Sequence, residues 1–146
     1  LLYGEKSLAL LQALAGVETL TDIHVETNGA VDLAMFLERV DSSKVRYIMD
    51  YKLTGSGERA RMIDGNLALL REQDELKFVV ADEADFDEAC RVLEALPTKA
   101  LPLFSPVWET MPPRRLAELL LERGPARARL NLQLHKIIWD PAMRGV

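Results

Sequence analysis

The sequence has little cysteine: Cys90 is the one thiol among 146 residues. A single cysteine excludes a disulfide within the chain and predicts a reducing compartment, the cytoplasm. It also excludes an iron–sulfur cluster held by this chain alone, because such clusters are bound by about four thiolates. Cys90 lies in a predicted helix, where we expect a packed and inert side chain.

Long apolar runs and an excess of positive charge are absent as well. No apolar run approaches the roughly 20 residues that span a bilayer, so we expect no membrane partner. The net charge is −5, and nucleic-acid binding needs a basic stripe, so we expect no nucleic-acid partner. Histidine, aspartate and glutamate nowhere gather at the spacing of metal ligands, which predicts no metal site within this chain.

The size and composition are those of one globular domain over residues 1–146. Hydrophobic residues make up 49% of the chain and charged residues 28%, which is enough apolar material for a core. The sequence shows no internal repeat, linker or low-complexity segment. It begins at Leu1-Leu2 rather than at Met, which we interpret as a segment of a longer protein.

Helical and strand patterns alternate along the chain. We predict helices at 5–15, 32–40, 58–72 (interrupted near 64–65), 85–96 and 112–123, and strands at 22–26, 45–52, 75–81, 100–104 and 127–135. Strict alternation predicts an α/β fold with parallel strands and crossover helices. Five strands fit either an open doubly wound sheet or part of a (β/α) barrel. In both, functional residues lie at the carboxyl ends of the strands.

Polar residues end the first predicted strand at this rim. Glu26 is followed by Thr27-Asn28-Gly29. Asn-Gly is a turn signal by itself, so turn chemistry alone is one interpretation. The other is functional, because a carboxylate at a strand end can accept hydrogen bonds from a ribose or a ring N–H group.

The second and last strands end in further candidates. Asp50-Tyr51-Lys52 precedes the glycine-rich loop 53–57, whose backbone N–H groups can hold a carboxylate or phosphate. The loop is no P-loop, since the order Gly-x-x-x-x-Gly-Lys-Ser/Thr is missing. A strand-end ion pair beside a surface loop is the alternative. His135 is predicted to end the last strand, although a lone histidine is more often structural than catalytic.

Taken together, five motifs resemble the 7-carboxy-7-deazaguanine synthases, a family of radical S-adenosylmethionine (SAM) enzymes. Order and spacing match at 25–29 (Val-Glu-Thr-Asn-Gly), 49–52 with its Gly-Ser-Gly loop, 75–80, 133–139 (Gln-Leu-His-Lys-Ile-Ile-Trp) and 144–146 (Arg-Gly-Val). Glu-Thr-Asn-Gly alone is weak, because many radical SAM enzymes carry something similar. The C-terminal run is the specific part of the resemblance.

The resemblance implies a partial (β/α) barrel of the radical SAM type. It implies a lyase of queuosine biosynthesis, which converts 6-carboxy-5,6,7,8-tetrahydropterin to 7-carboxy-7-deazaguanine with loss of ammonia. The implied cofactors are SAM, a four-iron–four-sulfur cluster and Mg²⁺. The ligands of the cluster and of Mg²⁺ are expected outside this chain, which would be inactive alone. The implied partners are the pterin substrate, a reductant such as flavodoxin, and a second copy in a homodimer.

The resemblance also suggests site residues, although it assigns no catalytic residue. SAM contacts are expected from Asp50, Tyr51, Lys52, Ser105, Pro106, Val107 and Trp108. Many relatives carry Ser-Pro-Lys at 50–52, so Lys52 alone matches strictly, and the second segment is expected to contact SAM through its backbone. The terminal carboxylate of Val146 corresponds to a substrate contact. Glu26 and His135 are further substrate candidates from their place at the rim.

Two other functions stay open. One is a different radical SAM enzyme, such as an activase; the intact C-terminal run argues against it. The other is a cluster-less α/β module that binds a small molecule. A lone partial barrel would expose an unpaired sheet edge, which argues against that module.

Overall fold

A computed structural model describes residues 1–140 and residue 143. Its centre is a five-stranded parallel sheet with the order β1-β2-β3-β4-β5. The strands are β1 (Ile23–Thr27), β2 (Val45–Tyr51), β3 (Glu75–Val80), β4 (Leu101–Pro106) and β5 (Arg129–Leu130). The helices are α1 (Glu5–Ala15), α2 (Ala34–Arg39), α3 (Gly65–Leu69), α4 (Glu83–Ala95), α5 (Pro113–Arg123) and α6 (His135–Ile138), with short 3-10 turns at Thr54–Ser56 and Arg59–Arg61. The predicted α/β alternation is therefore confirmed.

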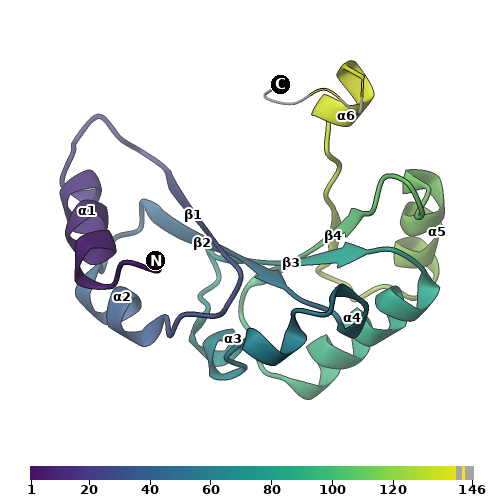
Figure 1. The fold of residues 1–146 in the computed structure, drawn as a ribbon, viewed down its shortest axis with the longest axis horizontal. Helices are drawn as coiled ribbons and strands as arrows, with labels where there is room; N and C mark the ends of the chain where they lie inside the picture. The colour runs from purple at the N-terminus through teal and green to yellow at the C-terminus, as the bar shows by residue number, and fades with distance from the viewer. Residues whose placement is uncertain (141–142, 144–146) are drawn as a thin grey trace.

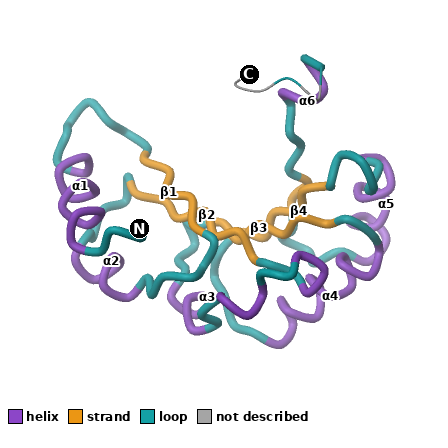
Figure 2. Tube along the Cα trace, in the orientation of Figure 1, coloured by secondary structure: helices purple, strands orange, loops and turns teal. Residues whose placement is uncertain are grey.

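The order of the strands bears on the choice between a doubly wound sheet and part of a (β/α) barrel. The strands follow chain order without the reversal that defines a doubly wound sheet. The sheet is bent, and α2 to α5 lie along its convex side, while the concave side is open (Figures 1 and 2). Within the described residues β1 and β5 do not pair, so the sheet is open and no barrel closes.

The core lies between the convex face of the sheet and the helices. Every second residue of β2 and β3 is buried, as expected for strands with one face under helices. Four aromatic rings pack in series from β2 to α4 at centroid distances of 5.3–5.4 Å: Tyr51, Phe78, Phe104 and Phe86. Burying an aromatic or large aliphatic side chain stabilises a fold by roughly 1.5–3 kcal/mol, so this layer dominates stability.

A buried carboxylate fixes the amino end of β2 against the loop before β3. Asp74 is fully buried and accepts hydrogen bonds from the backbone N–H groups of Tyr47 (2.9 Å) and Arg71 (2.7 Å). The Arg71 guanidinium adds two further bonds of 3.0 Å each. Such a carboxylate is tolerated in a core because both oxygens are paired.

Two predicted elements were wrong in extent. The helix predicted at 58–72 is a 3-10 turn followed by the short α3, because local ion pairs hold the polar segment, Arg59 with Asp64 and Arg61 with Glu58. The strand predicted at 127–135 ends at Leu130. Asn131 N–H still donates to the Phe104 carbonyl (2.8 Å), but the next rung needs an N–H from Pro106, which has none.

The chain beyond β5 leaves the sheet on its concave side. An extended segment leads to the short α6, which stands clear of the sheet in Figure 1. In the described part of the chain, no helix is long and apolar enough to cross a membrane.

Candidate functional site

The open concave face carries the polar side chains of the sheet. Side chains alternate between the two faces of a strand, so the residues between core positions lie on this face. They include His24, Glu26, Arg46, Asp50, Glu75, Lys77, Ser105 and Arg129. A parallel sheet is usually covered on both faces, and a charged, uncovered one indicates a surface that contacts a ligand or another segment.

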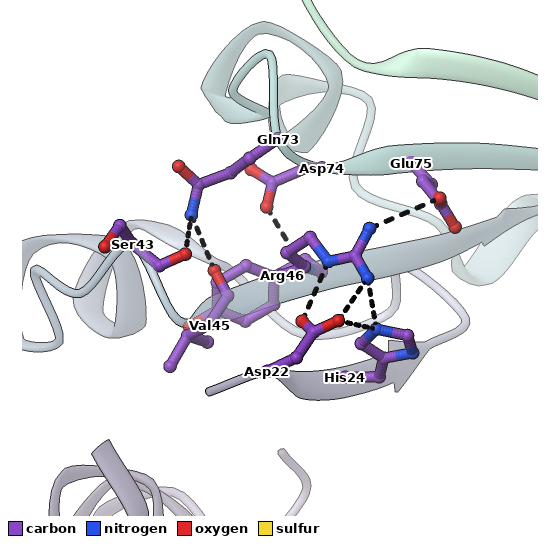
Figure 3. Close-up of polar contacts among 9 residues, drawn as sticks. Asp22, His24, Ser43, Val45, Arg46, Gln73, Asp74 and Glu75 are labelled. Carbon is purple, nitrogen blue, oxygen red and sulfur yellow. Dashed lines mark hydrogen bonds and ion pairs between the residues drawn. The ribbon is translucent and has the colours of Figure 1, made fainter. Parts of the chain in front are cut away.

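The charges at the amino end of this face pair with one another. Figure 3 shows the Arg46 guanidinium among Asp22, His24 and Glu75. Arg46 Nη2 lies 2.5 Å from Asp22 Oδ2, and Nε lies 2.9 Å from Oδ1. Hydrogen bonding to Arg46 lowers the pKa of Asp22 to about 2, so this carboxylate stays ionised at neutral pH. The cluster joins β1, β2 and β3, and its charges are already paired, which favours a structural role.

A pocket of about 390 Å³, the rim pocket, lies at the carboxyl end of β2 and β3. Its lining residues are Asp50, Tyr51, Lys52, Leu53, Gly55, Ser56, Val79, Ala81, Asp82, Asp85 and Val107. Lys52 Nζ donates to Asp50 Oδ2 at 2.7 Å. Asp50 Oδ1 is buried and has no hydrogen-bond partner among the described residues. An unpaired buried acceptor costs about 1–3 kcal/mol, so a donor from a bound ligand would be favoured there.

The glycine-rich loop of the rim pocket is held by the first turns of α4. Glu88 accepts hydrogen bonds from the Thr54 N–H (3.1 Å) and hydroxyl (2.8 Å). A Cβ on Gly55 would lie 3.1 Å from Asp85 Oδ1, so glycine allows the loop to approach this carboxylate closely. Asp85 also accepts from the Ala81 N–H, and Asp82 caps α4. The acidic residues of α4 therefore form a helix start that also anchors the loop.

Four of the seven predicted SAM residues meet at the rim pocket. Asp50, Tyr51, Lys52 and Val107 line it, whereas Ser105, Pro106 and Trp108 are not among its lining residues. The Tyr51 side chain is buried against the ring of Phe78 on the helix side, which leaves its backbone to face the pocket.

The second predicted segment was misplaced as a loop. Ser105 and Pro106 end β4 and are buried, because β3 and β4 pair as far as Val80 and Pro106. Ser105 Oγ accepts from the Asn131 amide at 2.8 Å. Trp108 is half-buried in the turn that follows.

A second pocket of about 210 Å³, the floor pocket, adjoins the rim pocket on the concave face. Glu26, Thr27, Asn28, Ile48, Asp50 and Lys77 line it. Asp50 belongs to both pockets. Sequence reasoning missed Lys77, although the alternation of Glu75–Val80, with Leu76, Phe78 and Val80 inward, places it on the open face.

The turn after β1 is positioned by a buried amide that the sequence did not reveal. Asn66 donates to the carbonyls of Gly29 (3.1 Å) and Val31 (2.9 Å) and accepts from the Leu33 N–H (3.0 Å). Gly29 has a φ of 74°, and a Cβ there would lie 2.7 Å from the Met62 methyl. The predicted turn is confirmed, and the positive φ favours glycine there, whereas the Met62 methyl is the end of a flexible side chain.

The structure places His135, the first of the two C-terminal candidates, away from the lining of both pockets. His135 begins α6 instead of ending a strand, and its side chain is exposed. It lines neither pocket. Val146 lies outside the described residues.

The side chains of this chain do not fit an iron–sulfur cluster. Cys90 lies half-buried on α4, where burial raises the pKa of its thiol and disfavours the thiolate that would bind iron. Among residues 1–140 and 143, no three His, Cys, Asp or Glu side chains gather as metal ligands.

Comparison with known proteins finds relatives that carry the same name. The chain is 31% identical over 135 residues to the 7-carboxy-7-deazaguanine synthase of Clostridium acetobutylicum, an alignment that covers 91% of this chain and 60% of the relative. It is 37% identical over 126 residues to the 7-carboxy-7-deazaguanine synthase of Leptospira interrogans, covering 84% and 50%. The same-named protein of Thermoplasma acidophilum is 31% identical over 140 residues, covering 93% and 65%.

These alignments cover only part of each relative. Across six such relatives the chain spans 47–65% of their length. No protein-family model matches the chain, and no solved structure matches it significantly.

Proposed function

The chain is a partial homologue of the 7-carboxy-7-deazaguanine synthases, and we propose that it forms the part of such an enzyme that binds SAM and the pterin substrate. The proposed reaction is the ring contraction of 6-carboxy-5,6,7,8-tetrahydropterin to 7-carboxy-7-deazaguanine with loss of ammonia. When bound, SAM supplies the radical chemistry, while the protein supplies orientation and electrostatics.

The rim pocket is the observation that carries this proposal. It joins the Asp50–Lys52 pair, the loop 53–57 and the turn after β4 at the carboxyl ends of neighbouring strands, where parallel α/β folds bind their ligands. Its volume of about 390 Å³ lies within the range of small-molecule sites. Lys52 carries an ammonium group that can donate to the carboxylate of SAM.

The substrate is proposed to lie beside SAM on the same face. Glu26 and Asp50 line the floor pocket, which adjoins the rim pocket through Asp50. A reduced pterin presents several N–H groups, and the two carboxylates are acceptors for them. A substrate held there would lie next to a ligand in the rim pocket.

The remaining parts of the enzyme are proposed to come from outside this chain. One cysteine cannot hold the cluster, so the cluster ligands are proposed to belong to other segments, and the Mg²⁺ ligands are proposed to lie beside them. The proposal includes a reductant such as flavodoxin, a homodimer and a cytoplasmic location. His135 and the Val146 carboxylate stay proposed substrate contacts.

Lys52→Met tests the SAM assignment. In the complete, cluster-loaded protein, this variant should bind SAM about ten- to a hundredfold more weakly, because it loses a charge-assisted hydrogen bond. Isothermal titration calorimetry measures the affinity. Lys6→Met is the matched control, since Lys6 is exposed on α1 and far from the rim pocket, and it should bind SAM as the wild type does. An unchanged SAM affinity in Lys52→Met would remove Lys52 from the site.

A further inference from the structure

Lys77 is a cation on the concave face that has no counter-ion among the described residues. It lies on β3 directly opposite Asp50 of β2 in the register of the sheet. Asp50 nevertheless pairs with Lys52 at 2.7 Å. The described residues give Lys77 no ion pair and no side-chain hydrogen bond, and its half-buried side chain lines the floor pocket. An ammonium that lines a pocket and has no partner among the described residues has the chemistry of an anion site.

The other polar groups of the floor pocket restrict which anion fits. Glu26 contributes a carboxylate that has no partner among the described side chains, and Asp50 contributes its buried, unpaired Oδ1. Two acceptors stand beside one cation. A phosphate would meet repulsion from both carboxylates, whereas a ligand with one carboxylate and several N–H groups matches the pocket group by group.

We propose that Lys77 determines substrate specificity by binding the carboxylate of a carboxylated nitrogen heterocycle in the floor pocket. Asp50 Oδ1 and Glu26 accept hydrogen bonds from the N–H groups of the same ligand. Lys52 Nζ donates to Asp50 Oδ2 at 2.7 Å and so orients this carboxylate from the side of the rim pocket. This inference rests on the proposed function, which places the substrate on the concave face. It adds Lys77 as the residue that binds the substrate carboxylate.

Two stable probes test the inference without turnover: 6-carboxypterin, which carries the carboxylate, and pterin, which lacks it. Pterin fluorescence gives the affinity of the complete protein for each probe. The wild type should prefer 6-carboxypterin. Lys77→Met should lose about ten- to a hundredfold in affinity for 6-carboxypterin and change by less than about threefold for pterin.

Matched variants separate recognition from folding. Lys77→Arg keeps the charge and should keep most of the preference, and Lys99→Met, which removes an exposed lysine before β4, should leave both affinities unchanged. If Lys77→Met loses both probes together, Lys77→Gln is titrated and the ratio of its two affinities decides.

The outcomes distinguish this inference from the proposed function. A wild-type preference that survives in Lys77→Met or Lys77→Gln overturns the role of Lys77 and leaves the proposed function standing. If the wild type binds 6-carboxypterin and pterin with equal affinity, the role of Lys77 is likewise overturned and the proposed function still stands. A wild type that binds neither probe contradicts the proposed substrate, and the inference with it.

Discussion

Asp74→Ala is expected to lower the free energy of unfolding by about 3–5 kcal/mol, the cost of breaking a buried charged network by removing one partner. The fully buried carboxylate accepts four hydrogen bonds, two from backbone N–H groups and two from the Arg71 guanidinium. Alanine leaves the N–H groups of Tyr47 and Arg71 without an acceptor. It also leaves the Arg71 cation half-buried without its carboxylate.

Urea denaturation of the complete protein measures this loss from the shift in midpoint. The control is Glu72→Ala, which removes an exposed carboxylate from the same loop and should change the free energy of unfolding by less than about 0.5 kcal/mol. Equal midpoints for Asp74→Ala and the wild type would show that the network contributes no net stability.

Asn66→Ala is expected to cost about 2–4 kcal/mol, because the Val31 carbonyl and the Leu33 N–H lose their partner and the Gly29 carbonyl keeps only its bond from the Ile63 N–H. These groups are the carbonyls of Gly29 and Val31 and the Leu33 N–H, all in the connection between β1 and α2. That connection carries Asn28 at the edge of the floor pocket. The variant should therefore lose pterin affinity as well as stability.

Thermal unfolding followed by circular dichroism, together with a pterin titration below the melting temperature, measures both effects. Asn28→Ala is the matched control: its exposed side chain makes one local hydrogen bond, to the Ala30 N–H, and its removal should cost less than about 1 kcal/mol. An Asn66→Ala protein as stable as Asn28→Ala would contradict the role given to the buried amide.

Much of the fold could be predicted from local patterns. The helices Glu5–Ala15 and Pro113–Arg123 were predicted closely because apolar spacing and a following glycine agree in both regions, and a proline starts the second helix. The last strand failed for a non-local reason. Its alternating pattern continues to His135, but whether it pairs depends on Pro106 of β4, which cannot donate the next hydrogen bond.

The candidate site also has features that the sequence predicts and features that only the folded chain shows. Strand ends are visible in sequence, so Asp50, Lys52 and Glu26 could be placed at one rim. Which charges stay unpaired depends on side-chain geometry across strands. The sequence could therefore not show that Asp50 pairs with Lys52, and that Lys77 has no ion pair within the part of the chain that the structure describes. Asn66 bonds to residues more than thirty positions away, and no local pattern reveals such a contact.

We propose that this chain belongs to the substrate side of a deazaguanine-forming enzyme. The most direct measurement is mass spectrometry of the small molecules after the complete, cluster-loaded protein is incubated anaerobically with SAM, a reductant and 6-carboxy-5,6,7,8-tetrahydropterin. We expect 7-carboxy-7-deazaguanine together with released ammonia. Unchanged pterin, with SAM bound and the cluster intact, would contradict the proposed reaction and favour a module that binds ligands without converting them.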